Sequence, residues 1–349
     1  MLTLAVPMLG LRLGSSDAGN DPAGQTTRKA YDLIAQGFGK GFNGPLQVAV
    51  KLPQANAAAS LTQLNAGLRA APDVASVAVP RIDAAGTTAA IQVFPRSSPQ
   101  SAQTTNLVTH LRNSVLPPIE RATGTTVYIG GATASQVDFA NVLSSKLPLF
   151  IGIVIALSAL LLMIVFRSFV IPLQAAVMNV LSIGAALGIV QAVFERGWVF
   201  GIQPGPIDAF IPVMGFAIIF GLSMDYEVFL ISRVHEEWQR TGDATSAIRE
   251  GLGHTGRVIT AAAAVMVAVF GAFAISGNRT LELFGVMMAS AVFLDAVVIR
   301  MIMLPAVLQL LGRRTWEFPR GLDRRLPRLA IEPPSGAQRA PSPALEEAA

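Results

Sequence analysis

The sequence predicts a membrane-spanning bundle of five α-helices that carries an α+β domain outside the membrane. The 349 residues are 52% hydrophobic and only 14% charged, whereas soluble domains average about 25% charged residues. Residues 11–146 are polar and punctuated by Gly and Pro, and long apolar runs recur from Leu147 onward. The chain therefore divides into a polar domain and a membrane region.

The amino-terminal and carboxy-terminal ends differ from both of these parts. Residues 1–9, "MLTLAVPML", are apolar but too short to cross a bilayer. We expect residues 1–10 to be the last turns of a transmembrane helix whose beginning is missing. Residues 312–349 are rich in Arg, Pro and Ala, which predicts a basic cytoplasmic tail with a disordered end.

The polar domain, residues 11–146, shows short strand and helix patterns. Strands are predicted at 45–52, 74–80, 88–95 and 125–131. Helices are predicted at 57–71 and 101–119. Leu61, Leu64 and Leu68 share one face of the first helix, and Pro117 and Pro118 are expected to end the second. The order β-α-β-β-α-β is that of a ferredoxin-like split fold.

Five apolar segments follow, each long enough to cross the hydrocarbon core, which needs about 20 residues. They are residues 147–166, 170–194, 207–231, 258–276 and 283–311. The alternative is a soluble protein that buries all five helices. A soluble protein would have to bury them within 165 residues, 147 to 311, so we favour the membrane bundle.

The loop arginines predict the orientation of the bundle. Two lie in the short loops on one side, Arg196 and Arg279. Eleven lie on the other side, at positions 167, 233, 240, 249, 257, 313, 314, 320, 324, 325 and 328. Because cytoplasmic loops carry the excess of Lys and Arg, residues 11–146 are expected outside a cell membrane and the C-terminus in the cytoplasm.

A run of polar side chains, Asp225, Tyr226 and Glu227, interrupts the third span. Asp225 lies about six residues past the midpoint of 207–231, roughly 9 Å towards the cytoplasm at 1.5 Å per residue. A charged residue at that depth normally faces a bundle interior, where a carboxyl able to exchange protons suits a proton-coupled machine. The Tyr226 hydroxyl could bond a carboxyl of a neighbouring helix. A structural role for Asp225, pinning a neighbouring helix, is the alternative.

The other polar residues of the spans have structural and functional interpretations. Glu227 is 200° round the helix from Asp225, so we favour a charge pair near the cytoplasmic boundary for it. Asp295 and Arg300, five residues apart, should point about 140° apart. We therefore expect them to bind different neighbouring helices, or the cytoplasmic interface in the case of Arg300. Residues that could support a relay are Asn179, Ser223, Glu227, Asp295 and Arg300.

Small and hydroxylic residues predict where the helices pack closely. Asn179 and Ser182 are typical interhelical hydrogen-bonding residues, and Gly184 and Gly188 form a small-xxx-small face. Close packing beside Asp225 is expected at Gly221 and Ser223.

Three separated segments resemble the MMPL family (mycobacterial membrane protein large) of the RND superfamily of transporters. They are "LRLGSSDAGNDP" with "GFGKGFNGPL", "GLSMDYEVFLISR", and "LDAVVIRMIMLPAVLQLLGRR-W" with "FPRGLDRRLP". This resemblance implies two homologous six-helix halves, each with a porter-like outer domain, of which this chain matches the second. It also implies that Asp225 and Tyr226 form one of two Asp-Tyr pairs in a proton relay, the other pair belonging to the first half.

The resemblance favours half of an exporter of lipid-like or hydrophobic compounds that uses the proton gradient and needs no cofactor. Alternatives are a truncated or sterol-sensing-like lipid-binding module that does not transport, and a SecD/SecF-like accessory of protein secretion. The expected partners are membrane lipids, the substrate, and the missing first half or a homologous protomer. We expect no binding of nucleic acid.

The sequence lacks the residues that several other functions require. The chain has no cysteine and three scattered histidines, which disfavours a metal site. No GxxxxGK[ST] stretch for ATP binding occurs. No nucleophile elbow or His-containing triad is apparent in residues 11–146, so we expect that the chain is not an enzyme.

Overall fold

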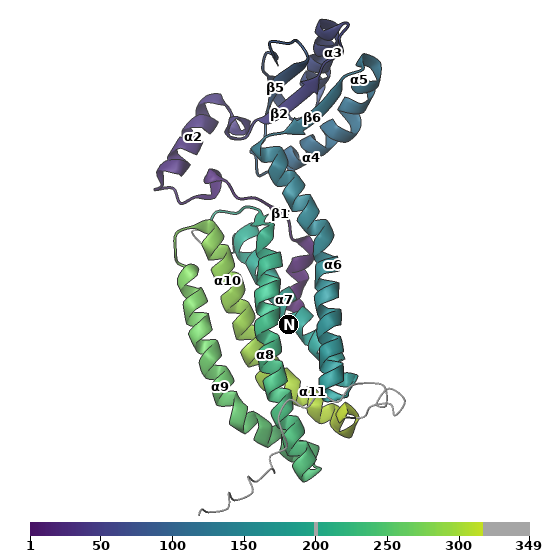
Figure 1. The fold of residues 1–349 in the computed structure, drawn as a ribbon. Helices are drawn as coiled ribbons and strands as arrows, with labels where there is room; N and C mark the ends of the chain where they lie inside the picture. Colours follow the sequence, from purple (N-terminus) through teal and green to yellow (C-terminus); the bar gives the residue numbers. More distant parts are fainter. Residues whose placement is uncertain (199–201, 317–349) are drawn as a thin grey trace, which may run out of the picture.

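The computed structural model describes residues 1–198 and 202–316. A sheet-containing domain stands at one end of a bundle of long helices, and α6 (Ala132–Phe166) runs without a break from the domain into the bundle (Figure 1). The described residues contain five helices long and apolar enough to cross a membrane. The predicted helical membrane bundle is confirmed. Of the predicted tail 312–349, only the residues up to Trp316 lie within the described part of the chain.

Each predicted span corresponds to one observed helix. The elements are α6, α7 (Val170–Val190) with the π-helical η5 (Gln191–Glu195), α8 (Phe210–Thr241), α9 (Ala244–Phe273), and α10 (Arg279–Phe293) with the π-helical η6 (Leu294–Met303) and α11 (Leu304–Leu311). Several helices extend beyond the apolar segments, because polar residues can continue a helix into water. As a result α6 begins inside the segment assigned to the polar domain, at Ala132.

The sheet domain is built on four main strands and a short fifth. They are β2 (Leu46–Lys51), β3 (Val74–Val77), β4 (Arg81–Ile82), β5 (Thr88–Pro95) and β6 (Thr126–Gly130). The order is β3-β5-β2-β6, with every neighbouring pair antiparallel and β4 beside β5. Alternation of burial along β2, with Leu46, Val48 and Val50 buried, turns one face of the sheet to the helices. Leu64 and Leu68 of α3 (Ala57–Ala70) join that core.

The second helical segment of this domain is longer than predicted. It comprises α4 (Ala102–His110), the π-helical η4 (Leu111–Val115) and α5 (Leu116–Thr123). The prediction that Pro117 and Pro118 end the helix is therefore wrong. They lie at the start of α5, directly after the π-helical η4, and the helical segment continues past both prolines to Thr123.

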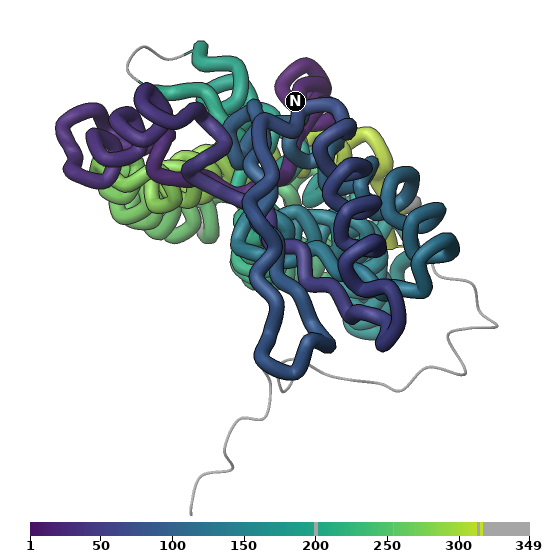
Figure 2. Tube along the Cα trace, turned by 90° about the horizontal axis from the view of Figure 1, so that it is seen from above, coloured from purple at the N-terminus to yellow at the C-terminus, as the bar shows by residue number. Residues whose placement is uncertain are grey.

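The segment before the sheet contains a helix that the sequence analysis did not predict. β1 (Leu13–Gly14) and η2 (Ala18–Asn20) lead to α2 (Thr26–Phe38), and η3 (Lys40–Asn43) follows it. No residue of α2 is buried. In Figure 2 it stands to one side of the sheet domain, and the Gln25 side chain before it donates to the Gly277 carbonyl (3.2 Å) between α9 and α10.

A polar junction attaches this segment to the end of the bundle nearest the sheet domain. β1 pairs in parallel with β7 (Ile207–Asp208), just before α8. The Asp208 carboxylate accepts from the Ser16 backbone N–H and the Thr280 hydroxyl, both at 2.8 Å. Arg279 was counted as a loop arginine but is buried, and it donates to the Ser16 hydroxyl at 3.1 Å. The junction therefore joins the segment after the first helix to α8 and α10.

The amino-terminal residues pack on the face of α7 that is formed by the small residues Gly184 and Gly188. The α1 helix (Leu2–Ala5) and η1 (Val6–Gly10) contact α7. A β-carbon added at Gly188 would stand 1.8 Å from the Leu4 carbonyl oxygen. A β-carbon added at Gly184 would stand 3.4 Å from the Ala5 β-carbon. The predicted close packing is confirmed at Gly188, where only glycine lets the backbones come so near. At Gly184 an added β-carbon would make an ordinary van der Waals contact.

We expect Gly188→Ala to loosen the amino-terminal segment and lower the thermal stability of the purified chain in detergent. The new methyl group overlaps backbone, which cannot rotate away as a side chain can. Gly152→Ala in α6 is the matched control, since a β-carbon there meets nothing within 4 Å and alanine favours the helix. Equal melting temperatures for Gly188→Ala and the unmodified chain would contradict the packing described here.

Candidate functional site

Five buried polar side chains converge where α7, α8 and η6 meet inside the apolar bundle. They are Asn179, Ser223, Glu227, Asp295 and Arg300. All five belong to helices long and apolar enough to cross a membrane, and the hydrophobic cluster around them is contributed by these helices together with α6 and α9. Because polar groups in such surroundings are costly unless they are paired, their convergence identifies this buried cluster as the candidate site.

The Ser223 hydroxyl lies at the centre of the buried cluster. It is 2.5 Å from Asn179 Oδ1 on α7 and 3.0 Å from Asp295 Oδ1 on η6. A hydroxyl has one proton to donate, so it can bond only one of these acceptors at a time. The Ser223 position therefore connects three helices through a single exchangeable hydrogen bond. Asn179, considered a possible supporting residue, does contact the cluster.

Arg300 is the cation of the cluster. Its Nε donates to Asp295 Oδ2 at 3.0 Å, and its Nη2 donates to the Ser223 hydroxyl at 2.7 Å and to the Ser223 carbonyl oxygen. The same Nη2 stands 3.9 Å from Glu227 Oε2. With only 1% of its surface exposed, this guanidinium is held entirely by protein groups. It joins the last helix to α8 at the depth of Ser223.

The predicted separation of Asp295 and Arg300 is wrong, because the helix that carries them is not an α-helix. Residues 294–303 form the π-helix η6, in which backbone hydrogen bonds join residue i to residue i+5. Residues five apart therefore lie one turn apart on one face, not 140° apart. Such π segments are rare and occur often at functional sites.

The structure also reverses the expected positions of Asp225 and Glu227. Glu227, not Asp225, points into the bundle, with 3% of its surface exposed. Asp225 is exposed on the opposite face of α8, close to the middle of the helix. The helical angle of 200° between them was correct, but which of the two faced the other helices depended on the packing. The cation near Glu227 is Arg300, whose Nη2 lies 3.9 Å from Glu227 Oε2.

An exposed stripe runs along α8 through Asp225. Its members are Phe210, Met214, Ile218, Gly221, Asp225 and Phe229. Their spacing of three and four residues places them on one helical face. A β-carbon added at Gly221 would meet nothing within 4 Å, so the close packing expected there does not occur within this chain.

Tyr226 lies between the Asp225 stripe and the buried cluster. Its ring centroid is 5.9 Å from the Arg300 guanidinium carbon, within range of a cation–π contact. Its hydroxyl donates to Met266 Sδ on α9 at 3.7 Å. Within the described chain this hydroxyl contacts sulfur and not the carboxyl that was expected. Tyr226 therefore follows Asp225 in the sequence and contacts Arg300, the cation of the buried cluster, with its ring.

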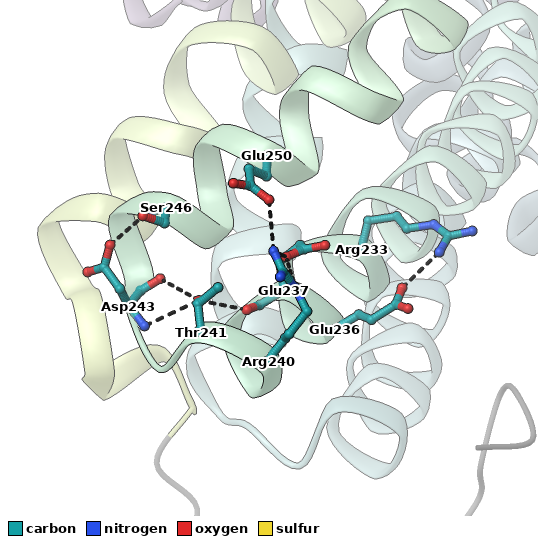
Figure 3. A network of polar contacts seen from close by, with 8 residues as sticks. All are labelled: Arg233, Glu236, Glu237, Arg240, Thr241, Asp243, Ser246 and Glu250. Atoms are coloured by element: carbon teal, nitrogen blue, oxygen red, sulfur yellow. Dashed lines mark hydrogen bonds and ion pairs between the residues drawn. The ribbon is translucent and has the colours of Figure 1, made fainter. Parts of the chain in front are cut away.

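A second polar network occupies the end of the α8–α9 hairpin farthest from the sheet domain (Figure 3). Arg240 contacts Glu237 at 2.8 Å and Glu250 at 3.1 Å, and Asp243 caps α9 by accepting from the Ser246 N–H at 2.9 Å. The Arg240 side chain is well exposed, and exposed ion pairs contribute little to stability. This network suits a water-facing hairpin end. Across residues 1–198 and 202–316, no group of three His, Cys, Asp or Glu could hold a metal ion.

The fold and the buried cluster define a multi-pass membrane protein with ionisable groups inside its bundle. The chain belongs to the MMPL family, whose profile matches residues 22–331. The resemblance drawn from the three sequence segments is thereby confirmed.

Named relatives align over most of this chain but over less than half of their own length. Membrane protein YdfJ of Bacillus subtilis is 34% identical over 95% of this chain and 46% of its own. The mycolic acid-containing lipids exporter MmpL11 of Mycolicibacterium smegmatis is 31% identical, covering 96% and 36%. The trehalose monomycolate exporter MmpL3 of Mycobacterium tuberculosis is 36% identical, covering 69% and 25%.

One feature of the sequence could have predicted that Glu227 belongs to the buried cluster. Ser223 and Glu227 are four residues apart, so they share a helical face. If Ser223 packs against another helix, as was predicted, Glu227 must lie on the same side. Asp208 and Arg279 were missed because neither lies in a periodic pattern and their partners are distant in sequence.

Proposed function

We propose that this chain is the second half of a proton-driven exporter of lipid-like or hydrophobic compounds in the cell membrane. The observation that carries the proposal is an exposed carboxylate, Asp225, near the middle of a membrane-length helix whose opposite face carries a buried ionic cluster. Membership of the MMPL family supports transport rather than catalysis. The names of MmpL11 and MmpL3 as lipid exporters support a lipid-like substrate. The proton gradient would supply the energy, with no cofactor.

The relay would use Asp225 and Tyr226. A charged residue facing the hydrocarbon core costs about 2.5–3.5 kcal/mol on insertion scales, so the Asp225 stripe needs a protein or aqueous neighbour. Asp225 would bind and release the proton on that uncovered face. Tyr226, beside it in sequence and against Arg300 in space, would communicate its state to the buried cluster.

The neighbour on the Asp225 stripe would be the first half of the transporter. This chain corresponds to 46% and 36% of the lengths of YdfJ and MmpL11, which leaves room for a second bundle of similar size. The stripe combines apolar side chains, a glycine and one acid, as expected of a helix face that packs on another helix. A first half could belong to the same longer protein or to a separate protomer.

The sheet domain would be a ferredoxin-like porter domain outside the membrane. The strand order β3-β5-β2-β6 and the sequence of helices between the strands support this fold. The orientation is supported by Arg233, Arg240 and Arg249, which lie towards the hairpin end of α8 and α9, opposite the sheet domain. Basic residues favour the cytoplasmic side.

Cysteine labelling of intact cells tests the topology. The chain has no native cysteine, so single substitutions report one position each. Ala84→Cys in the β4–β5 turn should react with an impermeant thiol reagent, and Thr245→Cys at the α8–α9 hairpin should react only after permeabilisation. Both positions are exposed, so burial cannot explain a difference. Labelling of Thr245→Cys in intact cells would invert or refute the orientation.

A large side chain at Gly221 tests the proposed partner. Gly221→Trp should leave the fold of this chain unchanged but prevent its copurification with a coexpressed first half, because the stripe would no longer fit. Gly152→Trp is the matched control, since both glycines have nothing within 4 Å. Unimpaired copurification and transport by Gly221→Trp would show that the Asp225 stripe is not the interface.

A further inference from the structure

We propose that Glu227 is a proton-binding carboxyl of the buried cluster and that it competes with Asp295 and Ser223 for Arg300. This inference rests on the proposed function, because it adds a second proton-binding position to the proposed relay. This second position is separate from the Asp225–Tyr226 pair, because Glu227 lies on the other face of α8 from Asp225.

The buried cluster contains one more acid than base. Glu227 and Asp295 face a single guanidinium, Arg300, and 3%, 4% and 1% of their respective surfaces are exposed. The other elements packed here bury no compensating charge: α7 contributes the neutral Asn179, and residues 147–166 of α6 and 258–273 of α9 contain no charged residue. Arg257 of α9, which precedes the second range, is exposed. A buried charge without a partner is strongly unfavourable. One of the two carboxyls therefore takes up a proton.

The contacts of the two carboxyls decide which of them is protonated. Asp295 has the Arg300 Nε at 3.0 Å on one oxygen, and on the other, also at 3.0 Å, the Ser223 hydroxyl, which it shares with Asn179. Glu227 is 3.9 Å from Arg300 Nη2, beyond hydrogen-bonding distance. Charge-assisted hydrogen bonds stabilise the ionised form of Asp295. The arrangement in the structure is therefore that of an ionised Asp295 and a neutral Glu227.

Loss of the proton from Glu227 would change the contacts between two helices. An ionised Glu227 would draw Arg300 Nη2, now 3.9 Å from Glu227 Oε2, to hydrogen-bonding distance and away from the Ser223 hydroxyl and carbonyl that it now contacts. Those contacts join α8 to η6, so the helix interface would depend on the proton. The same movement would change the cation–π contact of Arg300 with the Tyr226 ring, whose centroid is 5.9 Å from the guanidinium carbon. Tyr226 is the residue next to Asp225 in the sequence.

Infrared spectroscopy of the purified full chain in lipid nanodiscs tests this inference directly. The C=O stretch of a protonated carboxyl is separate from that of a carboxylate, so a pH titration reports buried acids. We expect a protonated-carboxyl band that persists near neutral pH and is absent in Glu227→Gln. The band should remain in Asp225→Asn and in Glu236→Gln, the latter being the matched control because Glu236 is exposed on the same helix.

The conservative change Glu227→Asp guards against a folding defect. It keeps a titrating carboxyl, so the band should persist at a shifted frequency. A band that survives Glu227→Gln, or that disappears in Asp225→Asn, overturns the inference, as does the absence of any band in the unmodified chain near neutral pH. Full transport by Asp225→Asn with an intact Glu227 band would instead refute the proposed relay and leave the protonation of Glu227 standing.

Discussion

Replacing Asp225 with Asn is expected to abolish proton-driven transport when the chain is completed by a first half. Asparagine keeps the size and hydrogen bonding of the side chain but cannot bind and release a proton. Asp225 is exposed within this chain, so the substitution leaves the packing of the bundle unchanged. The measurement is efflux of a hydrophobic fluorescent substrate from vesicles with an imposed pH gradient.

Companion variants separate the relay from structural effects. Tyr226→Phe removes one hydroxyl and leaves the titrating group, so a partial loss is expected. Glu236→Gln, on the exposed hairpin side of α8, should transport normally. Glu227→Gln is expected to impair transport, because that side chain is buried beside Arg300. Undiminished gradient-driven efflux by Asp225→Asn would rule out the relay.

Replacing Arg300 with Gln is expected to have the largest effect on stability. Removing one member of a buried ionic group destabilises a protein by about 3–5 kcal/mol, because the remaining charges are left without a partner. Here both Asp295 and Glu227 would lose the cation, and Ser223 would lose two donated hydrogen bonds. The measurement is the unfolding midpoint of the purified chain in detergent.

Arg300→Lys provides the matched comparison. Lysine restores one positive charge but lacks the planar fork that lets Arg300 contact Asp295 and Ser223 together, so we expect an intermediate midpoint. Combining Arg300→Gln with Glu227→Gln and Asp295→Asn should recover part of the loss, because no buried charge then remains. An Arg300→Gln protein as stable as the unmodified chain would show that the cluster does not hold the helices together.

The buried cluster could be predicted from the sequence in composition but not in geometry. Asn179, Ser223, Glu227, Asp295 and Arg300 were all identified as possible supporting residues, since polar groups are rare in apolar spans. Their pairing was not predictable, because the sequence indicates no π-helix at 294–303. An α-helical assumption separates Asp295 from Arg300, and a single additional residue in the hydrogen-bonded ring brings them together.

The amino-acid sequence by itself determined the five membrane spans, the order of strands and helices in the sheet domain, and the small face of α7. These properties depend on local runs and periodicities of apolar and small residues, which remain visible without any partner. Only the tertiary structure decided which side of α8 is covered. Asp225 and Glu227 lie on opposite faces of one helix, and which face packs against α7 and η6 is set by all the contacts of the bundle together. The tertiary structure likewise buried Arg279 and Asp208, because their partners lie in segments far away in the sequence.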